Sequence, residues 1–407
     1  MDSLLYKIPV GRKGEEKLNS KFDVYFWKII YQFVENDYKV MRVTQQENEV
    51  WLEFIQYNKV SLIRMVRYDI DWSYWLQRDM EYARRVVEQL AKRYYARSIE
   101  VLNIYVTTYP PVDDWEYLVT RPFKVEGRNE ATMSSVVIHE ANIDDALETL
   151  RQRTGVQISR SSFAFEDDDL VELQRVKQSL INLVKETREK EKQVYEYGTP
   201  FFTYMFIIVQ VVMFLFLEWK GGSTNPRVLI EYGAKFNPLI EQGEWWRFIT
   251  PVFLHVGFLH LLMNTLALYY LGAMVERIYG SFRFLFIYLF AGSFGTLGSF
   301  LFTPSVSAGA SGAIFGLFGA LLYFGTVYKH LFLRTIGMNI ISLIGINLLF
   351  GFIVPGIDNA GHIGGLVGGF LSACMVQLPR HRFTQKQLLS LVITFLIVFA
   401  VIYNDFY

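Results

Sequence analysis

The amino-acid sequence predicts a mixed fold, with a soluble α/β domain in the first half and an all-α domain of membrane-spanning helices in the second. Of the first 200 residues 62 are charged, against 18 of the remaining 207. Hydrophobic residues make up 52% of the chain, and its mean hydropathy is +0.20, which is high for a soluble protein. These values exclude an enzyme that is soluble throughout. The balance of 40 basic and 40 acidic residues excludes a dominant nucleic-acid-binding charge, so no nucleic-acid partner is expected.

Residues 1–195 alternate between helical and strand-like patterns, which predicts a small α/β domain. Its last part, 167–192, is a charged stretch with sparse apolar positions and is expected to form a connector helix that leads to a hinge at 195–200. The other predicted elements are a helix with Phe22, Phe26, Ile29, Ile30 and Phe33 on one face, a hairpin of 50–55 and 60–66 around Asn58, a helix from Asp71 to about Tyr95, and a strand over 99–106.

The start of the chain has no apolar run of signal-peptide length, so we expect the N-terminal domain to stay in the cytosol. The single cysteine, Cys374, lies within an apolar run. One cysteine allows no disulfide within the chain and no thiolate metal cluster, and we expect Cys374 to be a buried, inert thiol.

An acidic group, Glu166 to Asp169, directly precedes the connector helix. The simpler interpretation is compensation of the helix dipole at the N-terminus, and the alternative is a site for a divalent cation. A regulatory partner in the cytosol is the other candidate ligand of this domain, whose role in sensing, adaptor binding or dimerisation is left open by the sequence.

The second half contains uncharged stretches long enough to cross a membrane, which takes about 20 apolar residues in a helix. One stretch, 284–328, is too long for a single crossing and is divided at Thr303, Pro304 and Ser305. Six spans are expected in a domain over 196–380, and a seventh with an extracytoplasmic tail in 381–407. The seven spans are 201–217, 248–275, two within 284–328, 335–357, 359–379 and 387–404.

The basic residues of the short loops predict the orientation of these spans. With the N-terminus in the cytosol, the inner loops carry seven lysines and arginines, whereas the short outer loops near Pro304 and Pro355 carry none. Four basic residues fall in the long outer loop 218–247, where the rule is weak. The C-terminus at Tyr407 is then expected outside. The seven inner residues are Arg277, Arg283, Lys329, Arg334, Arg380, Arg382 and Lys386.

Five polar residues lie within the predicted spans, where polar groups are costly and therefore candidates for function. His260 and Asn264 are four residues apart and share one helix face. Taken singly, such residues also have simpler explanations: hydrogen bonds between packed helices, a serine bonded to its own helix, or a packed or proton-relaying histidine. The five are His255, His260, Asn264, Ser311 and His362.

Ser311 and His362 stand at similar depths, because each lies about one turn from the outer end of its span and the two spans run in the same direction. Glycines around both residues, at four-residue spacing after Gly361, allow the two helices to approach closely. A serine needs a neighbouring base to become nucleophilic, and histidine is the usual one. His260 and Asn264, with the Ser311 backbone amide, are candidates for the donors that stabilise an oxyanion.

These motifs resemble the signature of the rhomboid family of intramembrane serine proteases. The resemblance covers residues 199–378, and it is carried by His255, His260 and Asn264, by Gly309 to Gly312, and by Gly361 to Gly365. Trp246, Arg247, Glu276 and Gly280 also match family positions. The N-terminal domain and the seventh span are similar to the Gram-positive bacterial type, whose members carry helical repeats after the last span. This sequence ends at Tyr407 without such repeats.

The resemblance implies a rhomboid-type membrane domain and a role for each site residue. Ser311 would be the nucleophile and His362 its base, in a dyad without an aspartate. The implied oxyanion hole consists of His260, Asn264 and Ser311. The implied site-shaping residues are His255, Phe315, on which the catalytic histidine packs, Gly309 and Gly361.

The resulting hypothesis is an intramembrane serine endopeptidase that cleaves transmembrane segments near the outer membrane face. It implies a multi-pass protein of a bacterial plasma membrane, with transmembrane substrates and the lipid bilayer as partners and with no cofactor or metal. The sequence has no HExxH motif, and His255 and His260 lie on different helix faces. The alternatives are a catalytically silent adaptor or quality-control factor for membrane proteins, and a transporter or channel, which inverted repeats or a charged midplane would favour.

Overall fold

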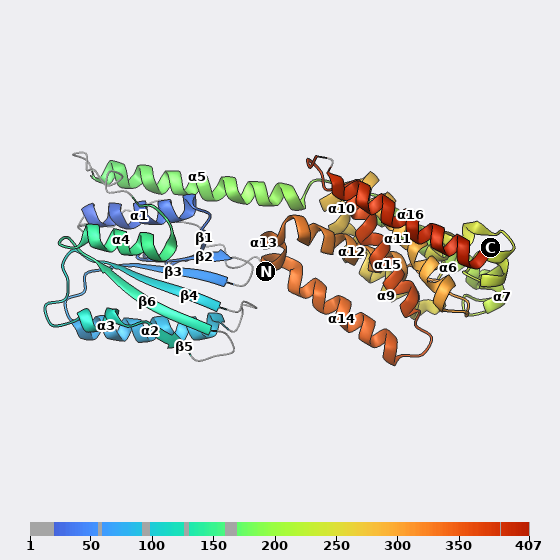
Figure 1. Ribbon diagram of the computed structural model, residues 1–407, viewed down its shortest axis with the longest axis horizontal. Coiled ribbons are helices and arrows are strands. Elements are labelled where there is room, and N and C mark those ends of the chain that lie inside the picture. The colour runs from blue at the N-terminus through green and yellow to red at the C-terminus, as the bar shows by residue number, and fades with distance from the viewer. Residues whose placement is uncertain are drawn as a thin grey trace. The chain divides into compact units, whose positions relative to one another are not determined.

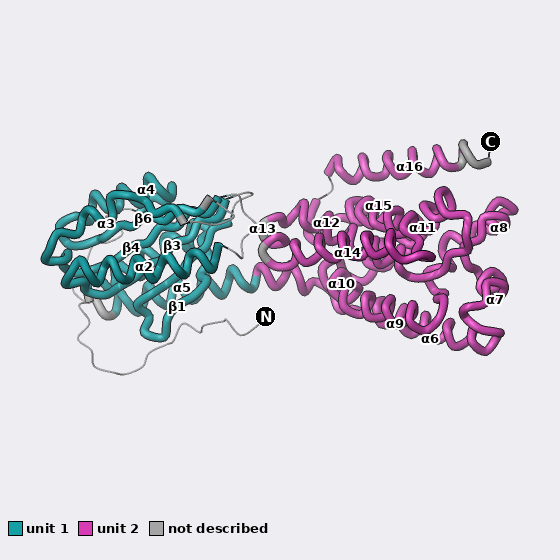
Figure 2. Tube along the Cα trace, turned by 90° about the horizontal axis from the view of Figure 1, so that it is seen from below, with its two compact units in different colours: residues 1–189 teal, residues 190–407 magenta. Residues whose placement is uncertain are grey.

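The structure is a computed structural model that describes residues 20–55, 59–91, 98–125, 130–158, 169–382 and 384–406. The chain forms two compact units, Met1–Glu189 and Lys190–Tyr407 (Figure 2). The first unit combines a sheet with helices, whereas the second is helical. The predicted succession of an α/β region and a helical region is therefore confirmed.

The first unit is built on a six-stranded mixed sheet with the strand order β1-β2-β3-β4-β6-β5. β1, β2 and β3 form an antiparallel meander, β3, β4 and β6 run parallel, and β5 is antiparallel to β6. The strands are β1 (Lys39–Val43), β2 (Glu49–Ile55), β3 (Lys59–Arg67), β4 (Ser98–Val106), β5 (Phe123–Val125) and β6 (Glu130–Ile138).

Helices cover both faces of this sheet (Figure 1). α1 (Ser20–Glu35), α4 (Ile143–Thr154) and α5 (Asp169–Tyr195) pack on one face, and α2 (Ser73–Ala91) and α3 (Glu116–Thr120) pack on the other. The predicted helix face of α1 is confirmed, because Phe26, Ile30 and Phe33 are completely buried in the larger core. The antiparallel pairing of the predicted hairpin strands and the strand over 99–106 are also confirmed, as β2, β3 and β4, whereas Asn58, the predicted centre of the hairpin, lies outside the described residues.

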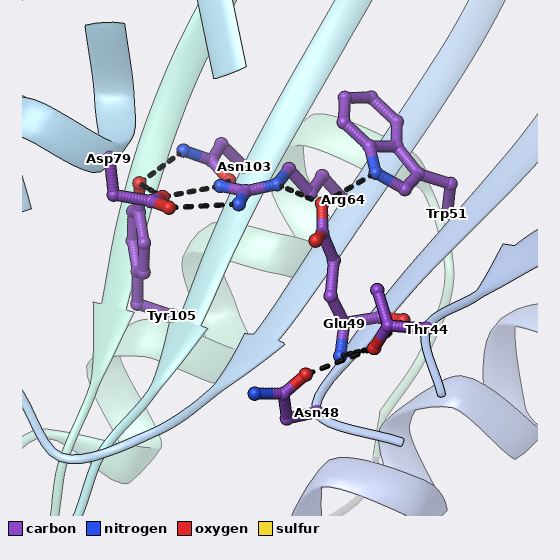
Figure 3. Close-up of polar contacts among 8 residues, drawn as sticks. All are labelled: Thr44, Asn48, Glu49, Trp51, Arg64, Asp79, Asn103 and Tyr105. Carbon is purple, nitrogen blue, oxygen red and sulfur yellow. Dashed lines mark hydrogen bonds and ion pairs between the residues drawn. The ribbon is translucent and has the colours of Figure 1, made fainter. Parts of the chain in front are cut away.

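A polar cluster is buried between the sheet and α2 (Figure 3). Arg64 on β3 is almost fully buried, and its guanidinium donates to both carboxylate oxygens of Asp79, at 2.5 and 3.0 Å, and to Glu49 at 2.8 Å. Asn103 accepts a further bond from Arg64, and the Tyr105 hydroxyl donates to Asp79 at 2.6 Å. The buried charge of Arg64 thereby joins the sheet to α2. Removal of one of its charged partners would leave a buried charge uncompensated and would strongly destabilise the fold.

Two predicted helices of this unit lie next to residues that the structure does not describe. The helix expected from 71 to 95 is α2, which begins at Ser73 and is described to Ala91. The connector helix is α5, which begins at Asp169 and extends to Tyr195. The acidic residues 166–168, for which a cation site was one hypothesis, lie outside the described residues.

The second unit consists of apolar helices at the predicted positions, with short helices in its loops. Within the described part of the chain, five helices are long and apolar enough to cross a membrane, and Ser311–Val327 and Gln385–Val401 are shorter apolar helices. Several apolar helices are the feature expected of a multi-pass membrane protein, whereas the number of seven crossings stays a prediction. The main helices are α6 (Phe202–Trp219), α9 (Gly257–Ala267) continued by α10 (Ala273–Tyr279), α11 (Ser281–Phe302), α12 (Ser311–Val327), α14 (Met338–Ile353), α15 (Asn359–Val376) and α16 (Gln385–Phe406).

α15 packs more extensively against α11 and α12 than against other helices of the chain's described part. Glycines make this packing possible. A Cβ atom added to Gly365 would lie 1.9 Å from the carbonyl oxygen of Gly312, and one added to Gly369 would lie 1.9 Å from that of Gly316. The backbones of α12 and α15 are thus in direct contact, as small residues at four-residue spacing allow.

Candidate active site

Ser311 and His362 are placed by the starts of two adjacent helices. Ser311 is the first residue of α12, and His362 lies in the first turn of α15. Asp358 caps α15, because its carboxylate accepts a hydrogen bond of 2.9 Å from the Gly361 amide. Since the two helices run side by side in the same direction, their glycine contact brings the two starts together.

The structure joins Ser311 and His362 by a hydrogen bond. Ser311 Oγ lies 2.9 Å from His362 Nε2, and His362 is buried. The His362 ring stacks on Phe315, one turn further along α12, with the ring centroids 4.3 Å apart and the planes inclined by 12°. His362 Nδ1 is buried and has no hydrogen-bond partner among the described residues. The arrangement is therefore a serine–histidine pair whose imidazole is oriented by an aromatic ring.

His260 and Asn264 lie on α9, close to the start of α12. The His260 ring contacts Gly309 so closely that an added Cβ on the glycine would lie 2.6 Å from His260 Cε1. Gly309 also has a φ of +148°, which side chains rarely adopt. The Asn264 side-chain amide donates one hydrogen bond, of 2.9 Å, to the His260 carbonyl. An asparagine amide has two N–H donors, so this bond uses one of the two donors of Asn264.

His255 lies behind His260. It is completely buried, and its ring meets the His260 ring edge to face at 5.5 Å. Neither ring nitrogen of His255 has a hydrogen-bond partner among the described residues. His255 thus packs against His260, and the structure gives it no hydrogen bond to Ser311 or His362.

The loops around the dyad are joined by a network that the sequence analysis missed. The Asp358 carboxylate accepts hydrogen bonds from Thr303 Oγ1 at 3.1 Å and Ser307 Oγ at 2.8 Å. The buried Lys235 donates to the carbonyls of Thr303 and Ser305, and its backbone pairs with that of Ser307. Apart from the cap at Asp358, no local sequence pattern indicates this network, because its partners come from three separate loops.

A small cavity of about 30 Å³ lies beside the dyad. Its lining includes Ser311, Gly309, Asp358 and Lys235. A water molecule needs roughly 10–15 Å³ of such volume and two to four polar partners, and both conditions are met here. The site can therefore hold a water molecule within the protein next to the serine.

Comparisons with known proteins agree with this geometry. The family model named Rhomboid, the rhomboid domain, matches residues 242–379. The "Rhomboid protease GluP" of Bacillus subtilis (strain 168) is 41% identical over 379 residues, which cover 93% of this chain and 74% of that protein. The "Putative rhomboid protease YdcA" of the same organism is 40% identical over 180 residues, 44% of this chain and 89% of that protein.

A plant protein is also similar to part of the chain. The "RHOMBOID-like protein 5" of Arabidopsis thaliana is 40% identical over 174 residues, which cover 41% of this chain and 55% of that protein. Relatives that match less than half of the chain therefore stand beside one that matches nearly all of it. Taken with the similarity along nearly the whole chain, these matches show that the protein belongs to the rhomboid family.

Proposed function

We propose that this chain is an intramembrane serine endopeptidase that cleaves transmembrane segments through a Ser311–His362 dyad. The observation that carries the proposal is the 2.9 Å contact between Ser311 Oγ and His362 Nε2. A histidine at this distance can accept the hydroxyl proton as the serine attacks. The rhomboid proteases among the relatives support the same chemistry.

In the proposed reaction, Ser311 Oγ bonds to the carbonyl carbon of the substrate and passes its proton to His362 Nε2. The C–N bond of the tetrahedral intermediate then breaks, and His362 returns the proton to the leaving amine. Water next attacks the acyl-enzyme ester and transfers a proton to His362, and the proton returns to Ser311 Oγ as the carboxylic acid product leaves. The cavity beside Ser311 is a suitable source of that water.

The oxyanion would be stabilised by donors around Ser311. The backbone amide of Ser311 lies in the first turn of α12, where amides have no acceptor within the helix. The unused N–H of Asn264 and the ring of His260 are the side-chain donors proposed for the same position. Loss of one such donor typically lowers the rate by a factor of about 10²–10³.

The proposed orientation places the dyad toward the outer membrane face, with the N-terminal unit in the cytosol and the C-terminus outside. The distribution of basic residues in the short loops supports it. A dyad near the membrane surface has access to water, and a substrate helix must unwind there to expose its scissile carbonyl. Substrate segments with helix-weakening residues are therefore expected to be preferred.

A fluorophosphonate, which phosphonylates activated serines, tests this proposal. We expect mass spectrometry of the labelled full chain to locate the adduct on Ser311, and His362→Ala to abolish labelling. Ser293→Ala is a matched control, because Ser293 Oγ donates to a carbonyl of its own helix α11. An adduct on another residue, or labelling that persists in His362→Ala, would contradict the assignment of the dyad.

A further inference from the structure

A second cavity lies in the membrane domain at the helix ends opposite the dyad. It has a volume of about 180 Å³. Three of its walls come from the end of α10 at Ile278, from Tyr328 directly after α12, and from Leu378 directly after α15. The fourth wall is the last part of α5, with Lys190 and Gln193. Because α12 and α15 begin at the dyad, their far ends place this cavity at the other membrane face.

The lining of this cavity is cationic on one side and apolar on the other. Lys190 and Arg380 provide two positive charges, and among the nine residues described as lining it none is acidic. Ile278 and Leu378 are almost fully buried and form an apolar floor. The side chains thus match a ligand that has an anionic group joined to an apolar part.

Arg380 is held in place by its backbone and by one hydrogen bond. Its φ is +65°, which is uncommon for a residue other than glycine. Arg380 Nη1 donates to Gln193 Oε1 at 2.9 Å. A guanidinium has five N–H donors in a planar fork, and a fork of this kind suits the oxygens of a phosphate.

Neighbouring groups at this membrane face add to the positive character. Arg283 donates to the carbonyls of Val376 and Tyr279, near the ends of α15 and α10. The Tyr328 hydroxyl lies 2.9 Å from His381 Nε2. These contacts fix the helix ends around the cavity, so that its cationic side is part of a built wall.

We propose that this cavity binds the phosphate of an anionic phospholipid from the leaflet at the membrane face opposite the dyad. Basic pockets between helix ends at a membrane surface are suited to lipid head groups. Free inorganic phosphate shares the anionic chemistry, but it would leave the apolar floor without a partner. The location at the ends of the spanning helices, where lipid phosphates lie, favours the lipid.

A lipid bound there would connect the end of α5 to the helices that carry the dyad. Lys190 belongs to α5, whereas Arg380 follows α15, and one phosphate held by both would join them. The cavity is thereby suited to couple the composition of the membrane to the contact between the connector helix and the protease domain.

The test is native mass spectrometry of the purified full chain in detergent, titrated with dioleoylphosphatidylglycerol or dioleoylphosphatidylcholine. The variant combines Lys190→Gln with Arg380→Asn, because asparagine tolerates the positive φ at position 380, so the guanidinium is removed without forcing the backbone to change. The control combines Arg277→Gln with Lys386→Gln, which removes two charges from the same membrane face outside the cavity lining.

We expect the native chain to retain phosphatidylglycerol in preference to phosphatidylcholine, and the variant to lose about tenfold in affinity, the effect expected from the loss of two solvent-exposed charge contacts. The control should keep the native affinity. Equal retention of phosphatidylglycerol by variant and native chain would overturn the proposal. Inorganic phosphate is tested in a further titration. If it bound in a manner that depends on Lys190 and Arg380, and the chain showed no preference between the two lipids, the proposal that the ligand is a phospholipid would be overturned.

Discussion

At the residue scale, the orientation of His362 depends on its contact with an aromatic ring. Phe315 stacks on the imidazole at 4.3 Å, and Ser311 Oγ fixes the other side at 2.9 Å. Because Nδ1 has no partner among the described residues, the stack would take, in the proposed dyad, the orienting role that a carboxylate has in a serine–histidine–aspartate triad.

Phe315→Leu should therefore lower the proteolytic rate while the chain stays folded. Leucine keeps most of the apolar volume, but it removes a ring pair worth about 0.5–1.5 kcal/mol, which corresponds to a rate reduction of up to about tenfold. The measurement is kcat on a transmembrane reporter substrate together with thermal unfolding. An unchanged kcat would show that the ring does not orient His362.

The Asp358 carboxylate connects α15 to the loop before α12. Burial raises the pKa of Asp358, whereas hydrogen bonds from the Gly361 amide and the Ser307 and Thr303 hydroxyls lower it. The hydrogen bonds have the larger effect, so the pKa lies below its usual value. A carboxyl group whose pKa is lower in the folded state stabilises the protein above its unfolded pKa. This stabilisation is lost as the pH falls through the folded pKa.

Asp358→Ala should consequently reduce stability at neutral pH by about 1–2 kcal/mol, the usual effect of removing a helix cap. Thermal unfolding of the purified chain at pH 7 and at acidic pH provides the measurement. The difference between Asp358→Ala and the native chain should shrink as Asp358 becomes protonated. A difference that is independent of pH would show that the charge contributes nothing.

At the scale of elements, the dyad exists because α12 and α15 touch along their backbones. A Cβ on Gly365 would lie 1.9 Å from the Gly312 carbonyl oxygen, and neither backbone atom can move without separating the two helices. The sequence predicts this approach, because its glycines recur at four-residue spacing. α11 joins the contact through Gly295 and Gly298, which lie against the backbone of α15 at Gly361 and Ala360. The sequence does not predict this, because the spacing of these glycines does not show which helix they face.

Gly365→Ala should therefore separate α12 from α15 and abolish both activity and phosphonylation of Ser311. Gly345→Ala is the matched control, since an added Cβ at Gly345 in α14 would meet no atom within 4 Å. Replacing a helical glycine by alanine at an open site is expected to stabilise the helix by up to about 1 kcal/mol. Full activity of Gly365→Ala would contradict the direct backbone contact.

Glu276 connects two helices of the membrane domain, α10 and α6. Its buried carboxylate accepts hydrogen bonds from the amides of Phe201, Phe202 and Thr203, at 2.8 to 2.9 Å, and from Thr203 Oγ1 at 2.7 Å. It thereby caps the start of α6 from α10. The sequence marks Glu276 only as a family position, because the capped amides lie in a distant segment.

Glu276→Ala should leave these donors without an acceptor and destabilise the chain by at least about 3 kcal/mol, as expected when a buried charged partner is removed. The readout is the unfolding temperature in detergent. Glu231→Ala is the control, because Glu231 is an exposed carboxylate at the end of α7 (Pro226–Glu231). Equal unfolding temperatures for the two variants would contradict the capping role.

At the scale of the whole molecule, charge density alone predicts the division into two units, and hydropathy predicts the positions of the apolar helices. The sheet order is beyond sequence reasoning, because β6 pairs with β4 and β5 lies at the edge, an order that no local pattern encodes. Arg64 is a similar case. A charged residue within a strand indicates an exposed position, but Arg64 is buried, because Asp79 and Glu49 compensate its charge.

The site shows the same contrast. Ser311 and His362 can be brought together by reasoning from depth and glycine spacing, because both are local properties of their helices. The joining of three loops by Lys235, Thr303 and Asp358 could not be anticipated, since loop pairing depends on tertiary structure. The roles of His260 and Asn264 in oxyanion binding stay predictions that the unused Asn264 donor supports.

The central claim is that Ser311 and His362 form a proteolytic dyad. Its most direct test is cleavage of a transmembrane reporter by the purified full chain in liposomes, with Ser311→Ala and His362→Ala beside the native protein and Ser293→Ala. We predict cleavage by the native chain and by Ser293→Ala, unaffected by chelators, and none by the two dyad variants. Cleavage by Ser311→Ala or His362→Ala at the native rate would contradict the claim.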